Sequence, residues 1–145
     1  MDAFPHHYHV GFAMTPAEST VGLTSAGLAT LPSAPPAEFG GPGDQWSPET
    51  LLVGAIASCF ALSFRSVAEA SKFAWRSLRC EVDGTLDRQD RVTRFTAVSL
   101  SVELEIDEAG SAERAERLLH KAEEICLITN SLNAEVSFQA RVKAL

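Results

Sequence analysis

The segment from Ser47 to Ser71 decides the fold, and it reads SPETLLVGAIASCFALSFRSVAEAS. It opens with a strong helix start, because Ser47 can cap the helix, Pro48 fits the first turn and Glu49 complements the helix dipole. The first half of this helix is apolar nearly all round, and a helix of this kind is buried on most sides. In a chain of 145 residues this burial requires a sheet wrapped around the helix or a second subunit.

Alternating apolar residues after this helix predict an antiparallel hairpin. Residues 78–86 alternate, with Cys80 on the apolar face, and residues 96–106 give the clearest alternation in the chain. The polar residues 87–91 between them are expected to form the turn.

A second helix and a last strand complete the C-terminal part. The helix is predicted to start at Gly110-Ser111, and its apolar stripe reaches Cys126 at the helix end. Residues 134–142 alternate again and predict a strand.

The N-terminal part is predicted to contain three strands. Residues 8–14 alternate with period two, and short strands are expected around residues 20–23 and 27–31. The element order β-β-β-α-β-β-α-β then predicts one α+β domain over residues 1–145.

A proline- and glycine-rich loop, residues 32–46, precedes the long helix and carries Phe39 and Trp46. Its four prolines and three glycines exclude a regular helix or a central strand. Long ordered loops with aromatic anchors often border a site, although a simple connector is an equal alternative.

The charge pattern excludes a nucleic-acid partner, which needs clustered Lys and Arg. The formal net charge is -7, and no Lys or Arg precedes Arg65. The first residues lack the basic and apolar regions of a signal peptide, and the apolar run from Leu51 to Phe64 is shorter than the roughly 20 residues of a membrane span. We therefore expect a cytoplasmic protein with no membrane partner.

Three cysteines, Cys59, Cys80 and Cys126, give neither a disulfide scaffold nor the paired spacing of a zinc site. Free cysteines are often inert core residues, and pattern alone favours this interpretation for all three. A redox pair of Cys59 and Cys126 would require their Cα atoms to lie within about 7 Å.

Glu49 and Cys59 are separated by ten positions, or about 15 Å of rise on one helix. They can meet only across an antiparallel helix pair, as at a two-fold dimer interface. The alternative for Glu49 is a simple first-turn partner of the helix dipole. His7 and His9 share a strand face but lack the further ligands of a metal site, so we predict no metal and no other cofactor.

Two groups of motifs resemble the OsmC/Ohr family. The first comprises EFGG at residues 38–41, SPETLL at 47–52 and ASCF at 57–60. The second is CLITNSL at 126–132, in which Leu127 stands where the family commonly has proline. The element order also matches, so the resemblance covers nearly the whole chain.

The resemblance implies an OsmC-like fold in which antiparallel sheets wrap around a long buried central helix, within an intertwined homodimer. It implies a peroxidase for organic hydroperoxides, in which Cys59 is the nucleophile, Cys126 resolves it and Glu49 lies nearby. An external dithiol would restore the pair, without metal or prosthetic group. The candidate substrate-contacting residues are Phe39, Trp46 and Phe60.

One departure from the family concerns the thiolate. The family's peroxidases use an N-terminal arginine, which this chain lacks, so burial and the charge of Glu49 are expected to raise the pKa of Cys59. Two hypotheses follow: a peroxidase in which another group replaces the arginine, or a catalytically weak member that binds an apolar small molecule at the dimer interface.

Overall fold

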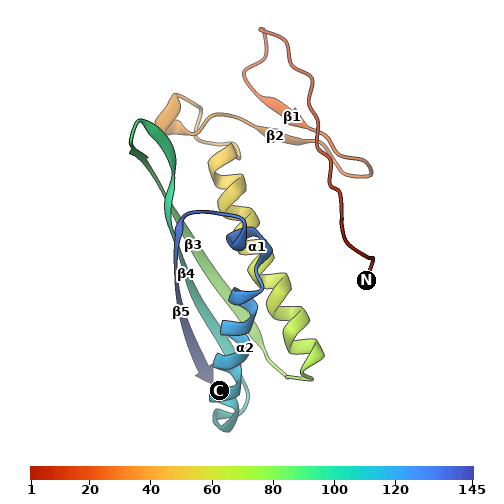
Figure 1. The fold of residues 1–145 in the computed structure, drawn as a ribbon, viewed down its shortest axis with the longest axis vertical. Coiled ribbons are helices and arrows are strands. Elements are labelled where there is room, and N and C mark those ends of the chain that lie inside the picture. The colour runs from red at the N-terminus through yellow and green to blue at the C-terminus, as the bar shows by residue number, and fades with distance from the viewer. The chain divides into compact units, whose positions relative to one another are not determined.

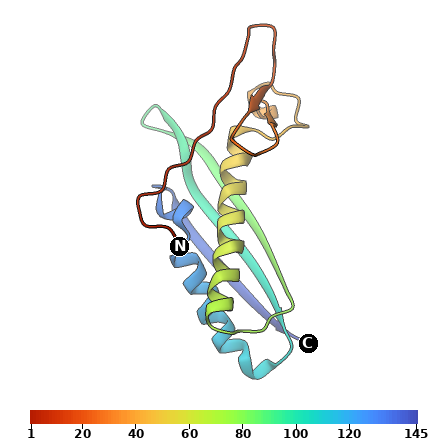
Figure 2. The same cartoon turned by 90° about the vertical axis from the view of Figure 1, so that its right-hand side faces the viewer.

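The computed structural model describes all 145 residues, which form two compact units, Met1–Leu52 and Val53–Leu145. The second unit contains a three-stranded sheet with helices packed on one face (Figure 1, Figure 2). Its elements are α1 (Pro48–Ala70), which starts in the first unit, β3 (Ser77–Gln89), β4 (Val92–Ile106), α2 (Ala112–Glu124), α3 (Leu127–Asn130) and β5 (Glu135–Ala144). The predicted α+β class is confirmed.

The predicted hairpin is confirmed as β3 and β4, but its turn is tighter than the polar residues suggest. Pairing continues from Ser77 opposite Glu105 to Gln89 opposite Val92. Only Asp90 and Arg91 remain in the turn, both with positive φ, 50° and 68°. A two-residue turn of this kind matches the twist of the flanking strands.

β5 lies beside β4 in the parallel direction, with Leu100 opposite Phe138. The expectation of purely antiparallel sheets is therefore wrong for this strand, and the sheet β3-β4-β5 is mixed. A parallel neighbour needs a crossover connection, which α2 and α3 provide.

α1 begins and ends where the sequence predicted. The Ser47 hydroxyl accepts a hydrogen bond from the Thr50 N–H (3.1 Å), and the Ser47 N–H donates to the Thr50 hydroxyl (2.8 Å). This reciprocal cap satisfies a donor that the helix itself leaves free.

Burial of α1 is narrower than expected. A single stripe packs on the sheet, while Leu62 on another face is 60% exposed. The expectation of burial on most sides is wrong for one chain, because β3, β4 and β5 cover only one side of the helix. The buried residues of this stripe are Ile56, Phe60, Phe64 and Ala68.

α1 is also long and apolar enough to cross a bilayer by length and composition. The core helix of a soluble protein meets the same criterion, and one stripe of α1 packs in the hydrophobic core, so length and composition are weak evidence of a membrane span.

The first unit contains only a two-stranded sheet, β1 (Val21–Leu23) against β2 (Leu31–Ser33). The strand predicted around residues 20–23 is confirmed, but the one at 27–31 begins only at Leu31. The prediction of a strand at residues 8–14 is wrong, because the only β-bridge of this segment joins Gly11 to Thr24. Its apolar side chains, those of Tyr8, Val10, Phe12 and Met14, are exposed.

Most of the loop predicted at residues 32–46 is confirmed. Its exceptions are the end of β2 and a 3-10 turn at Ala37–Phe39. Gly41 is required in this loop, because a Cβ there would collide with the carbonyl group of Pro35.

Candidate functional site

Cys59 and Cys126 are neighbours in the second unit, where each thiol affects the pKa of the other. Cys59 comes from the middle of α1. The expectation that Cys126 ends the second helix is wrong: α2 stops at Glu124, and Cys126 precedes α3 with φ −65° and ψ 102°. This extended residue turns the chain so that its thiol meets Cys59.

The surroundings of Cys59 favour its anionic form. Burial raises its pKa, but hydrogen bonds from the Ile128 peptide, the Cys126 thiol, the Ser63 hydroxyl and the Leu127 peptide together lower the pKa below its ordinary value. The Ser63 oxygen lies 4.0 Å from the Cys59 sulfur. In one chain, where Glu49 does not act on Cys59, this direction is opposite to the raised pKa expected from the sequence.

The pKa of Cys126 is shifted in the opposite direction, above its ordinary value. Its side chain is buried, and this burial raises its pKa. Hydrogen bonds from Thr129 oppose the shift, whereas the neighbouring Cys59 adds to it. Of the two neighbouring thiols, Cys59 is therefore the one that ionises more readily.

Cys80 stands apart from this pair. It lies on the face of β3 that packs against the core, as predicted. Burial and the charge of Glu81 raise its pKa to about 11. Such a thiol is almost entirely protonated at neutral pH.

Glu49 lines a mainly apolar pocket of about 280 Å³ in the first unit, together with Met14, Val21 and Phe39. One Glu49 carboxylate oxygen is buried without a hydrogen-bond partner. A buried acceptor without a hydrogen-bond partner is costly in free energy.

The three candidate substrate-contacting residues differ in exposure. Phe39 is 60% and Trp46 is 53% exposed, so both offer apolar surface in the first unit. Phe60 is fully buried in the second unit, with its ring centroid 5.5 Å from that of Phe138. Phe60 is therefore a core residue and offers no open surface.

The sequence analysis did not predict three groups that lower the pKa of Cys59, namely the Ser63 hydroxyl and the peptide groups of Leu127 and Ile128. Ser63 could have been found, because residues four apart share a helix face. The peptide groups of Leu127 and Ile128 could not, because every residue type except proline carries the same N–H.

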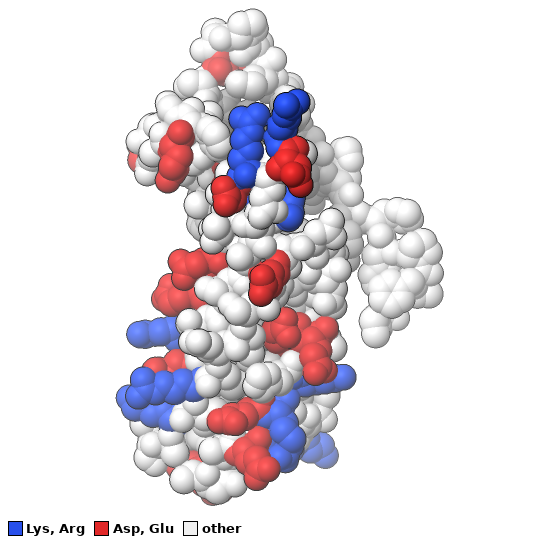
Figure 3. All heavy atoms as spheres, turned by 60° about the vertical axis from the view of Figure 1, so that its left-hand side comes forward, with Lys and Arg blue, Asp and Glu red and all other residues white.

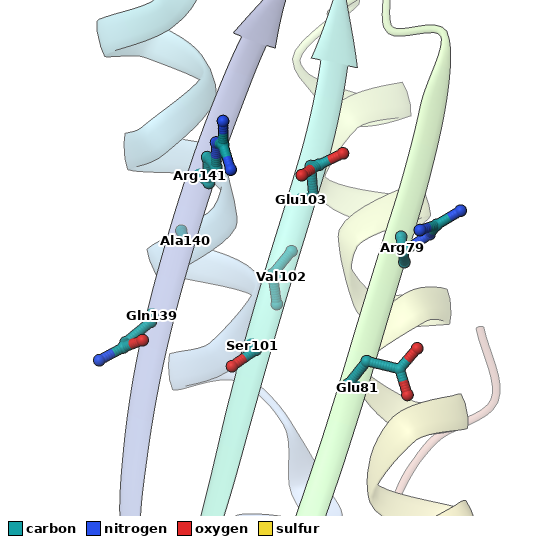
Figure 4. A pocket seen from close by; sticks show the side chains of 8 residues that line it. All are labelled: Arg79, Glu81, Ser101, Val102, Glu103, Gln139, Ala140 and Arg141. Carbon is teal, nitrogen blue, oxygen red and sulfur yellow. The ribbon is translucent and has the colours of Figure 1, made fainter.

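The outer face of the sheet β3-β4-β5 is the main alternative location for a functional site. It holds an open groove of about 520 Å³ in which Arg79 and Arg141 stand on either side of Glu103 (Figure 4). These three residues are direct cross-strand neighbours. On the face shown in Figure 3, basic and acidic side chains are interspersed.

Comparison with known proteins identifies the class. The family OsmC, described as OsmC-like protein, matches residues 41–141, and the chain belongs to this family. An uncharacterized protein, YmaD of Bacillus subtilis strain 168, is 27% identical over 143 residues, covering 95% of each chain.

Solved structures agree in fold. An OsmC-like protein of unknown function from Vibrio cholerae is similar with a TM-score of 0.80 at 20% identity, covering 96% of this chain and 100% of that one. An organic hydroperoxide resistance protein OsmC from Legionella pneumophila gives a TM-score of 0.72 at 25% identity, with 97% and 100% covered. A similarly named protein from Elizabethkingia anophelis gives 0.74 at 18% identity, with 98% and 100% covered.

Proposed function

We propose that this protein is a thiol-dependent peroxidase that reduces organic hydroperoxides, with Cys59 as the nucleophile and Cys126 as the resolving thiol. The observation that carries the proposal is the pair of neighbouring thiols, in which the pKa of Cys59 is lowered and that of Cys126 is raised. The family and the names of the Legionella and Elizabethkingia relatives support a role connected with organic hydroperoxides.

The reaction begins with attack of the Cys59 thiolate on the terminal oxygen of the hydroperoxide. The O–O bond breaks, the alkoxide takes a proton and leaves as an alcohol, and Cys59 becomes a sulfenic acid. The Cys126 sulfur then attacks the Cys59 sulfur, water leaves, and a disulfide forms. An external dithiol reduces this disulfide and is itself oxidised.

The roles follow from access as well as from acidity. Cys59 is partly exposed, whereas Cys126 is buried, so a hydroperoxide reaches Cys59 first. A nucleophile must be both ionised and accessible. Cys126 meets neither condition towards a hydroperoxide from solvent, but as a neighbour of Cys59 it needs no access from solvent to resolve the sulfenic acid.

The proposal includes a cytoplasmic homodimer in which residues 1–145 act as one domain. Glu49 and Cys59 stand ten positions apart on α1, so one chain alone keeps them about 15 Å apart. A second copy would bring the partner's first unit, with Glu49, Phe39 and Trp46, to Cys59. Phe39 and Trp46 would then contact the apolar part of the substrate.

The test is mass spectrometry of the reduced protein after treatment with about one equivalent of cumene hydroperoxide, a stoichiometry that follows from one disulfide per peroxide. A Cys59–Cys126 disulfide should form within seconds. Cys59→Ser should form none, and Cys126→Ser should stop at a sulfenic acid that dimedone traps. Two unmodified thiols after prolonged treatment would refute the proposal.

A second candidate function is binding of an apolar small molecule by a catalytically weak protein. The mainly apolar pocket beside Phe39 and Glu49 favours it. This function predicts that Cys59→Ser leaves ligand binding intact and that hydroperoxide leaves the thiols reduced. The experiment above therefore separates the two candidates.

A further inference from the structure

Cys126 lies in the short connection between α2 and α3, where its backbone is extended and not helical. The Cys126 N–H donates a hydrogen bond to the Glu123 carbonyl oxygen at 3.1 Å, so α2 holds this residue from its N-terminal side. The direction in which the chain continues, and with it the direction of the thiol, depends on what holds the Cys126 carbonyl group.

The carbonyl group of Cys126 is held by Thr129. The Thr129 hydroxyl donates a hydrogen bond to this oxygen at 3.1 Å, and the Asn130 N–H donates to the same oxygen at 3.0 Å. Thr129 is 5% exposed, so water does not compete for the hydroxyl bond. Thr129 therefore supplies the side chain that fixes the backbone of Cys126.

A hydroxyl at this position is unusual for the second unit. The buried residues with hydroxyl side chains are Ser33, Ser47 and Thr129, and the two serines belong to the first unit. Burial of a hydroxyl is unfavourable unless it is hydrogen-bonded, and valine has the same shape without this cost. The second unit thus places its one buried hydroxyl against the peptide of Cys126.

We propose that Thr129 positions Cys126 for disulfide formation with Cys59. The inference rests on the proposed function, because it takes Cys126 as the resolving thiol. Thr129 acts through Cys126 and is a positioning residue, since a fixed backbone restricts the thiol to fewer directions and raises its effective concentration towards Cys59. Thr129 also opposes the raised pKa of Cys126, which favours the attacking form of this thiol.

The test measures the equilibrium between the reduced protein and its Cys59–Cys126 disulfide in glutathione buffers, by peptide mass spectrometry after acid quenching. Oxidised glutathione takes up the electrons and protons of the two thiols and becomes reduced glutathione. The equilibrium constant gives the effective concentration of Cys126 towards Cys59. A loss of stability that is common to both forms leaves this constant unchanged.

Thr129→Val keeps the shape of the side chain and deletes the hydroxyl, while the Asn130 N–H still satisfies the Cys126 carbonyl oxygen. It should lower the effective concentration about fivefold to tenfold, the effect of one hydrogen bond of ordinary net strength. Thr129→Ser keeps the hydroxyl and loses the buried methyl group, and it should stay close to wild type. The opposite ranking, with Ser impaired and Val normal, would show a packing role and overturn the inference.

Ser131→Ala is the matched control within the same segment. The Ser131 hydroxyl donates to the Leu127 carbonyl oxygen at 2.7 Å and not to Cys126, so its loss should leave the effective concentration near that of wild type. An equal fall in Ser131→Ala and Thr129→Val would overturn the assignment to Thr129, as would a wild type that forms no Cys59–Cys126 disulfide with glutathione. A wild type that forms it with glutathione but stays reduced with cumene hydroperoxide would refute the peroxidase alone.

Discussion

At the scale of the residue, three cysteines of one chain differ only in their surroundings. Cys59 receives peptide and side-chain donors, Cys126 is buried beside another thiol, and Cys80 faces the core near a carboxylate. Donors to the sulfur favour the thiolate, whereas burial and a neighbouring negative charge disfavour it. The chemistry proposed for Cys59 is therefore a property of its contacts and not of its residue type.

Cys80 gives a prediction about alkaline stability. Its pKa is raised from 9.0 to about 11, because burial and Glu81 disfavour its thiolate in the folded protein. Its stabilising contribution is therefore present below pH 9 and is lost as pH rises towards about 11. Cys80→Ala should lose less stability than wild type over this interval, measured by urea unfolding at several pH values.

Other groups also titrate at alkaline pH, so the informative quantity is the difference between the two proteins. Parallel stability curves for wild type and Cys80→Ala above pH 9 would contradict the assignment. Cys59→Ser is the control variant, because its thiol has a lowered pKa and does not titrate in this way.

At the scale of the element, the packing of α1 on the hairpin depends on a missing side chain. A Cβ on Gly84 of β3 would lie 2.9 Å from the Val53 Cγ2 atom and 2.9 Å from the Phe95 ring. Such a distance is too short for non-bonded carbon atoms. Gly84 therefore permits the close approach of the helix that carries Cys59.

Gly84→Ala is predicted to destabilise the protein by about 1–3 kcal/mol, the usual cost of overpacking. Val53→Ala in the same chain should recover part of the loss, because it removes the methyl group that the new Cβ meets. Gly110→Ala is the control, since a Cβ there meets nothing within 4 Å. Urea denaturation curves measure all four proteins, and equal effects at Gly84 and Gly110 would disprove the account.

At the scale of the whole molecule, several large apolar side chains of this chain are exposed to solvent. Leu62 on α1 is 60% exposed, and Tyr8 and Phe12 of the N-terminal segment are 90% and 65% exposed. A soluble monomer rarely leaves so much apolar surface free. This pattern supports the proposed homodimer.

Leu62→Glu is predicted to shift the protein from dimer to monomer in sedimentation velocity experiments, because the burial of an unpaired charge is strongly unfavourable. Val92→Glu is the matched control, since Val92 has a similar exposure of 56% but belongs to the β3–β4 hairpin and not to α1. An unchanged sedimentation coefficient for Leu62→Glu would exclude α1 from the interface.

The elements that the sequence predicted well are those with a strong local pattern. The boundaries of α1 follow from the Ser47 cap and the continuous apolar stretch, and those of the hairpin from period-two alternation. The strand at 8–14 failed although its alternation is equally clear. A strand also needs a neighbour for its backbone hydrogen bonds, and the first unit offers residues 8–14 only one bridge.

The sequence by itself determined the α+β class, the central helix with Cys59, and the second cysteine segment, because these depend on residue type and spacing along one element. Only the tertiary structure decided that β5 runs parallel to β4, that Cys126 lies outside α2, and that peptide groups of Leu127 and Ile128 reach Cys59. The physical reason is that strand direction and peptide donors leave no mark on residue type. Both arise from contacts between segments that are distant in the chain.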